Sequence, residues 1–262
     1  MVQIIKKIQV NIPFTMLYET YLPLIIQYGI NPEIGLDAMA LDRFSISDFE
    51  NVVQEIHKQG LSITIHGPFM DLSPGSPDTK IRELTRYRFQ QVSRLIPVFL
   101  PKTVVCHTCY DNKRYGFLKE QWLKYSMELW AWFAESIRKE GSVLVLENVY
   151  ENNPHEFLEL YQDLMNQGVG FCFDVGHQAA FSHVSFASWL DNLGEFMAQL
   201  HLHDNHGIQD EHLPLGKGKI DFPMLFKYLK EKGLEPSIIT LEPHREEDLW
   251  PSLEYLERIW PW

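Results

Sequence analysis

Short apolar runs alternate with amphipathic segments along almost the entire chain. Runs rich in valine, isoleucine, leucine and phenylalanine predict strands, whereas apolar residues three or four positions apart predict helices. Strands are expected at residues 4–12, 33–36, 61–66, 103–107, 143–147, 169–174, 197–203 and 238–242. The helices that follow them are expected at 14–28, 47–59, within 79–99, and at 120–139, 154–166, 185–193, 222–232 and 247–259. Ser47, with Glu50 three residues later, is the expected N-cap of the second helix.

This alternation predicts one α/β barrel. The expected strands are nearly continuous apolar runs, as is typical of strands whose two faces are both covered. Eight strand–helix units in 262 residues are the pattern of a single (β/α)8 barrel, or TIM barrel, and no linker divides residues 1–262 into smaller domains. A doubly wound open sheet is the alternative. It is disfavoured because no glycine-rich dinucleotide-binding motif follows the first strand.

Composition narrows the class of protein. With 45% hydrophobic and 13% aromatic residues, the chain can bury a large core. The amino-terminal stretch has lysines within a short apolar run and no small-residue cleavage site, so we expect a first strand there rather than a signal peptide. No uncharged apolar segment is long enough to span a bilayer. The three cysteines, Cys106, Cys109 and Cys172, do not form a disulfide framework, which agrees with a cytoplasmic protein.

The charge balance bears on partners. The 23 basic and 35 acidic residues give a net charge of −12, which disfavours passive attraction to nucleic acid or to an anionic membrane. A nucleic-acid enzyme that binds phosphate through metal ions or a local basic patch remains compatible with this charge.

The ends of the expected strands share one chemical property. From the third strand to the eighth, each ends in a side chain that can bind a metal, and these are His66, His107, Glu147, Asp174, His201 and Glu242. Further candidates follow closely, namely His177, His203, Asp210 and His212. A single buried histidine or glutamate is usually a hydrogen-bonded core residue. Six on the functional rim of one barrel would carry heavy desolvation costs without a cation, so the sequence predicts a metal site.

The types of ligand indicate the kind of metal. Carboxylates neutralise or bridge divalent ions, while imidazoles prefer zinc, manganese, cobalt or iron to magnesium. The mixed set of nitrogen and oxygen ligands therefore predicts a divalent transition metal, with one to three ions.

At these residues the sequence resembles the xylose-isomerase-like barrels, which include endonuclease IV and many sugar-phosphate isomerases and epimerases. The resemblance covers nearly the whole chain and is strongest between Leu144 and Glu242. It rests on LEN at 146–148, FDVGH ending at His177, HLHDN beginning at His201, DEHLPLGKGKID beginning at Asp210, and LEP around Glu242.

The resemblance implies two possible ligand sets. In the isomerase and epimerase branch, the residues matching Glu147, Asp174, His201 and Glu242 hold one divalent ion. In the endonuclease IV branch, three zinc ions are held by the residues matching His66, His107, Glu147, Asp174, His177, His201, Asp210, His212 and Glu242. All nine positions are filled in this chain. His203 is left with a role in substrate binding or in support of the ligands.

Two reactions fit these sets. In a sugar or sugar-phosphate isomerase or epimerase, one metal stabilises an enediolate and the catalytic residues Glu147 and Glu242 exchange the carbon-bound proton. The alternative is a multinuclear zinc phosphodiesterase acting on abasic DNA or another phosphodiester, with a hydroxide generated by the metal cluster. A metal-stabilised binding barrel without turnover is a third class.

The residues expected on the rim favour a small carbohydrate as the partner. Nucleic acid would be the partner only if the protein were the alternative phosphodiesterase. The loop from Asp37 to Asp42 is acidic and apolar where a DNA enzyme needs basic residues. Phe69 is expected to pack over a sugar, in the core, or as a wedge in DNA. Cationic residues expected on the rim either bind a substrate phosphate or are solvated charges, and these are Lys113, Arg114, Lys217, Lys219 and Arg245.

Overall fold

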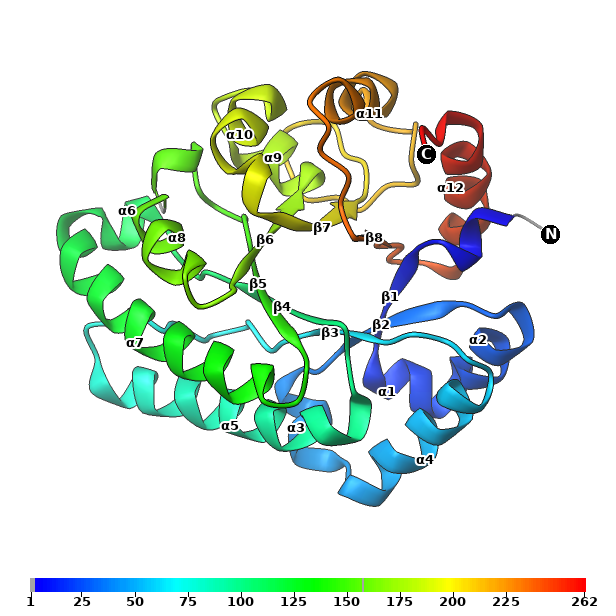
Figure 1. The fold of residues 1–262 in the computed structure, drawn as a ribbon, viewed down its shortest axis with the longest axis horizontal. Coiled ribbons are helices and arrows are strands. Elements are labelled where there is room, and N and C mark those ends of the chain that lie inside the picture. The colour runs from blue at the N-terminus through cyan, green and yellow to red at the C-terminus, as the bar shows by residue number, and fades with distance from the viewer. Residues whose placement is uncertain (1–2, 157) are drawn as a thin grey trace.

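The computed structural model describes residues 3–156 and 158–262, which form a barrel of parallel strands surrounded by helices (Figure 1). The barrel closes in chain order from β1 to β8. Its strands are β1 Gln9–Pro13, β2 Asn31–Gly35, β3 Thr64–His66, β4 Thr103–His107, β5 Val143–Glu147, β6 Gly170–Asp174, β7 Met197–Leu202 and β8 Ile238–Leu241. The predicted (β/α)8 barrel is therefore confirmed.

The helices cover the outside of the barrel. The longer ones are α2 Leu22–Tyr28, α4 Ile46–Lys58, α5 Thr79–Phe99, α7 Lys119–Arg138, α8 Leu158–Met165, α9 Val175–Phe181, α10 Phe186–Leu193, α11 Phe222–Glu231 and α12 Glu246–Ile259. Shorter helices and turns lie between them, namely η1 Gln3–Lys6, α1 Phe14–Met16, η2 Leu17–Tyr21, α3 Ala38–Arg43, α6 Asn112–Tyr115, η3 Gly116–Leu118, η4 Pro154–Glu156 and η5 Gly194–Phe196. Among the described residues, no helix is both long and apolar enough to cross a membrane.

The two faces of the sheet differ in chemistry. A large apolar cluster fills the space between strands and helices. Inside the barrel, the apolar residues Val105, Val145 and Cys172 form only a small cluster. Below the site, the fully buried Glu33 carboxylate accepts hydrogen bonds from the hydroxyls of Thr64, at 3.0 Å, and Thr240, at 3.1 Å. The barrel interior is thus partly polar.

Several expected boundaries were wrong. The first strand begins at Gln9, because the preceding residues form the turn η1, whose Gln3 N–H donates to Glu257 of α12 at 2.7 Å. Helix α4 is capped by Ser45 and Asp48, which form a reciprocal capping box, rather than by Ser47 and Glu50. The sequence offers both pairs at the same spacing, and only the path of the chain after α3 selects the first.

Candidate metal centre at the carboxyl ends of the strands

All the expected strand-end ligands lie at the same end of the barrel. Strand side chains alternate in direction, so His66, Glu147 and His201 share the inward face with residues two positions earlier. At β7 this inward set includes Gln199, whose amide donates to Thr240 of the neighbouring strand β8 at 2.9 Å. Parallel strands in register therefore bring ligands from six strands to one rim.

The loop after β7 folds back over this rim. Asp204 and Leu213 form an antiparallel bridge, with N–H···O distances of 3.0 and 2.8 Å. The bridge brings His203 and His212, which flank it, into parallel stacking with ring centroids 3.8 Å apart. His212 has a φ of 49°, a strained conformation for a residue with a side chain, and such strain is common at functional sites.

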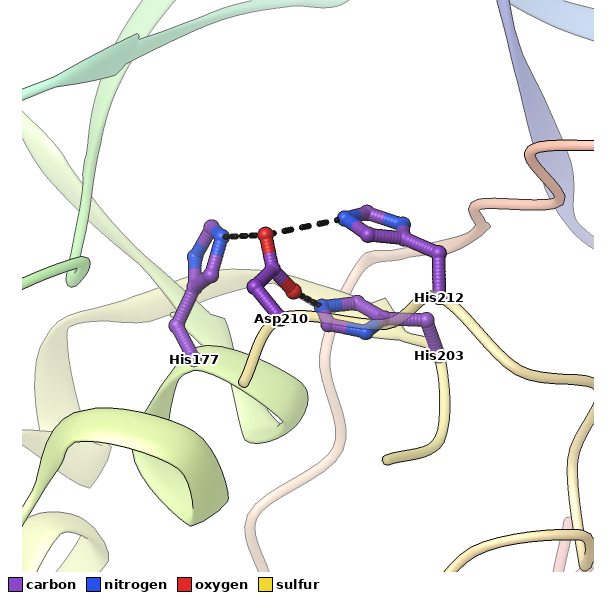
Figure 2. Close-up of side chains that lie close together, drawn as sticks. All are labelled: His177, His203, Asp210 and His212. Carbon is purple, nitrogen blue, oxygen red and sulfur yellow. Dashed lines mark hydrogen bonds and ion pairs between the residues drawn. The ribbon is translucent and has the colours of Figure 1, made fainter. Parts of the chain in front are cut away.

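Asp210 lies at the centre of this loop cluster, as Figure 2 shows. Its Oδ2 atom is 3.3 Å from His177 Nε2 and 3.2 Å from His212 Nε2. Its Oδ1 atom is 3.5 Å from His203 Nε2. The structure therefore brings together three residues that belong only to the endonuclease IV ligand set, with His203 beside them.

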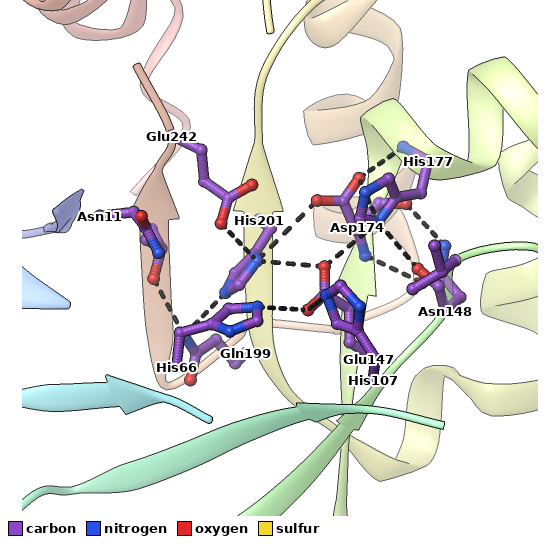
Figure 3. Close-up of polar contacts among 12 residues, drawn as sticks. Asn11, His66, His107, Glu147, Asn148, Asp174, His177, Gln199, His201 and Glu242 are labelled. Atoms are coloured by element: carbon purple, nitrogen blue, oxygen red, sulfur yellow. Dashed lines mark hydrogen bonds and ion pairs between the residues drawn. The ribbon is translucent and has the colours of Figure 1, made fainter. Parts of the chain in front are cut away.

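Glu147 lies at the centre of the second group, inside the barrel mouth (Figure 3). One carboxylate oxygen, Oε2, is 3.2 Å from His66 Nε2 and 3.4 Å from His107 Nε2. The other, Oε1, is 3.2 Å from His177 Nδ1 and 3.4 Å from His201 Nδ1. The two oxygens of Glu147 thus face different pairs of histidines. A carboxylate that bridged two metal positions would have this arrangement.

His201 and Glu242 complete the second group. His201 Nδ1 lies 3.1 Å from Glu242 Oε1 and 3.8 Å from Asp174 Oδ2. Glu147, Asp174, His201 and Glu242, the expected ligands of the single ion in the isomerase branch, are therefore grouped around His201 Nδ1. All four are buried.

Unpaired buried atoms test whether this set suits a cation. Among the described residues, buried side-chain atoms without a hydrogen bond include Glu147 Oε1, Asp174 Oδ2, His201 Nδ1 and Asp210 Oδ1. Such atoms are costly unless something else satisfies them. Tetrahedral zinc, with bonds of about 2.0–2.1 Å, places its ligand atoms about 3.3–3.4 Å apart. The separations of His201 Nδ1 from Glu242 and Glu147, 3.1 and 3.4 Å, match that spacing, and Asp174 lies farther away at 3.8 Å. With their unpaired atoms, these residues fit a divalent ion.

The orientation of three histidines supports the same conclusion. The Nδ1 atoms of His66, His177 and His212 donate to the backbone carbonyls of Gly67, Asn148 and Glu242, at 3.0–3.2 Å. Each ring then presents its Nε2 atom to a carboxylate oxygen. With the proton on Nδ1, two acceptors face one another, so a metal ion or a second proton must lie between them.

Electrostatics keep the carboxylates ionised. Burial alone would raise the pKa of Glu147, but the imidazoles of His201 and His107 outweigh it and hold the pKa well below its usual range. Glu242 follows the same pattern, with burial opposed chiefly by His201, and its pKa is also lowered. Burial would also raise the pKa of Asp210, but hydrogen bonds with His177 and His212 outweigh it. The pKa of Asp210 is therefore lowered as well. These three carboxylates are therefore ionised at neutral pH.

Several supporting residues were not expected from the sequence. Glu33 lies behind His201, with Oε1 3.2 Å from Nε2. Asn148 donates to the Asp174 carbonyl at 2.8 Å and accepts from the Asp174 N–H at 2.9 Å, which fixes the end of β6. Gly176 leaves the space that the His203 ring occupies. The sequence signal that could have identified Glu33 was an acidic residue inside a strand, between Pro32 and Ile34.

The expected substrate-binding residues have different locations. Phe69 stacks on His107 with ring centroids 4.3 Å apart and is 40% exposed, so it lies at the mouth of the centre. The Arg245 guanidinium instead binds Asp248 at 2.9 Å. The Lys217 side chain is exposed. The roles proposed for these three residues in substrate binding, like those of Lys113 and Arg114, remain predictions.

Hydrogen bonds to the side chain of Asp204 hold the glycine-rich turn at 215–219 in place. Buried Asp204 accepts hydrogen bonds from the N–H groups of Gly216, Gly218 and Ile220, at 2.8–3.2 Å. A β-carbon at Gly218 would lie 2.2 Å from the Asn205 carbonyl oxygen, so only glycine fits there. Those three N–H groups therefore form hydrogen bonds within the loop. The turn thereby positions the chain ahead of α11.

Comparisons with known proteins match most of the chain. A family model described as a xylose isomerase-like TIM barrel matches residues 32–259. The protein MJ1311 of Methanocaldococcus jannaschii is 29% identical over 211 residues, covering 75% of this chain and 69% of that protein. A second protein of that organism, MJ1614, is 28% identical over 209 residues, covering 76% of this chain and 78% of its own length.

Solved structures share the fold over nearly the full chain. The protein TTHB071 of Thermus thermophilus, in crystals soaked with ZnCl2, superimposes with a TM-score of 0.81 and 24% identity, covering 97% of both chains. A D-tagatose 3-epimerase-like protein gives 0.80 and 24%, covering 96% of both. The 3-keto-D-glucoside 4-epimerase of E. coli gives 0.72 and 15%, covering 96% of this chain and 98% of its own.

Proposed function

The chain belongs to the xylose isomerase-like TIM barrel family, and from this membership we propose that it is a metal-dependent isomerase or epimerase of a small carbohydrate. Sugar epimerases are among the proteins that share its fold. The substrate class is part of the proposal, because a fold does not determine a substrate.

One observation carries the proposal. His201 Nδ1 lies 3.1 Å from Glu242, 3.4 Å from Glu147 and 3.8 Å from Asp174, and it forms a hydrogen bond with none of them. These four residues would hold one divalent ion. When bound, the ion would polarise a sugar carbonyl and its neighbouring hydroxyl.

Glu147 and Glu242 are the proposed proton carriers. Glu147 ends β5 and Glu242 directly follows β8, and His201 Nδ1 lies between their carboxylates. Both have lowered pKa values, so each is ionised and able to accept a carbon-bound proton. In an epimerisation one glutamate removes the proton and the other returns a proton to the opposite face. Burial of both side chains limits the access of water to the reacting carbon.

The multinuclear phosphodiesterase remains the second candidate, favoured by a specific observation. His66 and His107 approach the same oxygen of Glu147, at 3.2 and 3.4 Å, and would hold an additional ion. His177, Asp210 and His212 would hold a third. In-line displacement at phosphorus uses such clusters to activate water and to stabilise the leaving oxygen.

Solvent-proton exchange tests the proposal. Metal-loaded protein should incorporate deuterium from D2O into the carbon next to the carbonyl of at least one ketose in a panel of free and phosphorylated sugars, followed by NMR. Glu147→Gln and Glu242→Gln should each reduce the exchange by about 100-fold or more, the usual contribution of a positioned acid or base. Glu211→Gln, at an exposed rim carboxylate that pairs with His206, is the control and should retain it.

A contrary result is equally clear. If no sugar exchanges but an abasic-site duplex is cleaved, and Asp210→Asn abolishes cleavage, the phosphodiesterase replaces the isomerase.

A further inference from the structure

We propose that the end of the barrel at which the strands begin has a binding site of its own, which takes the phosphate group of a small phosphorylated molecule. The site is a pocket of about 280 Å³ with positively charged walls and a polar floor, and its residues include Lys6, Lys7, Gln9, Asn31, Ser62 and Lys102. The inference goes beyond the proposed function and does not depend on it, because none of these residues belongs to the metal centre.

The pocket lies at the end of the barrel opposite to the metal centre. Gln9 and Asn31 are the first residues of β1 and β2, and Lys102 directly precedes β4. The residues of the metal centre instead lie at the carboxyl ends of the strands, as Glu147 does at the end of β5. A molecule bound in this pocket would therefore be a separate ligand from the substrate.

The charges around the pocket are of one sign. Lys6, Lys7 and Lys102 are exposed, and no carboxylate lines the pocket. In the part of the chain that the structure describes, none of the three ammonium groups forms an ion pair. The whole chain has 35 acidic against 23 basic residues, so this pocket has a charge opposite to that of the molecule. Its local field attracts anions.

Hydrogen bonds fix the backbone that bears two of these lysines. The Asn31 amide donates to the Lys6 carbonyl at 3.2 Å. The Lys102 N–H donates to the Ile63 carbonyl at 2.9 Å, and the Lys102 carbonyl accepts from the Val143 N–H at 3.2 Å. The lysines are therefore placed around the pocket before a ligand binds, which reduces the cost of ordering them on binding.

The floor of the pocket consists of ordered polar side chains. Gln9 is buried, and its side-chain amide lies 3.0 Å from the Ser62 hydroxyl. The Ser62 N–H donates to the side-chain oxygen of Asn31 at 3.0 Å. Hydroxyl and amide groups can donate hydrogen bonds to phosphate oxygens, so the floor complements the positive walls.

The size and charge of the pocket indicate the class of ligand. Lysine binds phosphate as a point charge, and three lysines can neutralise a doubly charged group. A volume of about 280 Å³ is close to the lower end of the range of about 300–1,000 Å³ for small-molecule sites. A polyanion such as nucleic acid would extend beyond the pocket over a surface whose net charge is −12.

Isothermal titration calorimetry of the metal-loaded protein with inorganic phosphate, at low ionic strength, tests the inference. Lys102→Gln should weaken phosphate binding by about 10-fold or more, the usual effect of losing one hydrogen bond to a charged group. Lys124→Gln, at an exposed position of α7, removes the same charge elsewhere and should leave the affinity unchanged. No binding to the native protein, or equal affinities of the two variants, would overturn the inference.

Other ligands in the same titration define the chemistry that the pocket recognises. A hexose 6-phosphate that binds more tightly than phosphate would show that the sugar also contacts the pocket, whereas equal affinities would assign the site to the phosphate group alone. Malonate, a dianion without phosphorus, should bind at least 10-fold more weakly. Malonate that binds as tightly as phosphate would overturn the assignment to phosphate.

Crystals soaked with tungstate separate this site from the metal centre. Tungstate is a tetrahedral dianion, and its anomalous scattering should give a peak beside Lys102 that is lost in Lys102→Gln. A peak only at the metal centre would overturn the inference. Neither the titration nor the soak uses turnover, so their results are independent of whether isomerisation is found.

Discussion

His201 Nε2 lies 3.2 Å from Glu33 Oε1, on the side of the imidazole opposite to the Nδ1 atom that faces Glu242 and Glu147. A carboxylate behind a ligating histidine fixes the tautomer and makes the ligand more basic. Glu33→Gln should therefore weaken metal binding by about 10–100-fold. Competition with a chelating dye measures the affinity. The exposed Glu50→Gln on α4 is the control, and an affinity of Glu33→Gln equal to that of the control would remove Glu33 from the centre.

Gly176 and His203 are in direct contact, which makes glycine necessary at this position. Gly176→Ala should lower the free energy of unfolding by about 1–3 kcal/mol, because the added carbon would lie 2.0 Å from a ring that His212 prevents from moving. Urea denaturation measures the change. Gly35→Ala, whose added carbon would make ordinary contacts at 3.5 Å or more, should cost clearly less. Equal stability of the two variants would contradict the packing argument.

Asp204 holds the turn at 215–219 through buried hydrogen bonds. Asp204→Ala leaves the N–H groups of Asn205, Gly216, Gly218 and Ile220 without their acceptor. At about 1–3 kcal/mol for each unsatisfied group, partly relieved by water, the cost should reach about 3 kcal/mol or more. Asp221→Ala, which removes only the N-cap of α11, should cost about 1 kcal/mol. Chemical denaturation of both variants tests this order, and the reverse order would refute it.

Glu151 makes stability depend on pH. Burial raises the pKa of this carboxyl to about 7, although Thr108 and the Val149 N–H both donate to it and oppose the rise. The folded chain therefore binds the proton more tightly than the unfolded chain, whose glutamate titrates near 4.5. The stabilising effect is complete below pH 4.5 and is lost as pH rises to about 7, a change of about 3 kcal/mol.

Glu151→Gln should remove this pH dependence. Between pH 4.5 and about 7 the free energy of unfolding of the native protein should fall relative to that of Glu151→Gln. Above about pH 7 the difference between the two proteins should stay constant. Denaturation at several pH values measures both proteins. Glu128→Gln, at an exposed position of α7, should follow the native curve. A difference between Glu151→Gln and native protein that does not vary with pH would show that Glu151 titrates normally.

The sequence by itself determined the barrel and the gathering of the strand-end side chains at one rim. Eight apolar runs separated by amphipathic segments have few ways to bury both faces of each strand, and a closed parallel barrel is one of them. Because the carboxyl ends of parallel strands share one rim, the last residues of β3 to β6 had to lie near one another. This argument needed only local patterns and the direction of the chain.

The tertiary structure alone decided how those ligands are divided. Glu147 faces histidines on both sides, Glu33 supports His201 from another strand, and His203 meets Asp210 because the Asp204–Leu213 bridge turns the loop back. These contacts join residues far apart in sequence or depend on a loop path that no periodic pattern encodes. Local spacing therefore predicted a metal centre at the rim, and the side-chain orientations divide its residues into one group around His201 and another around Asp210.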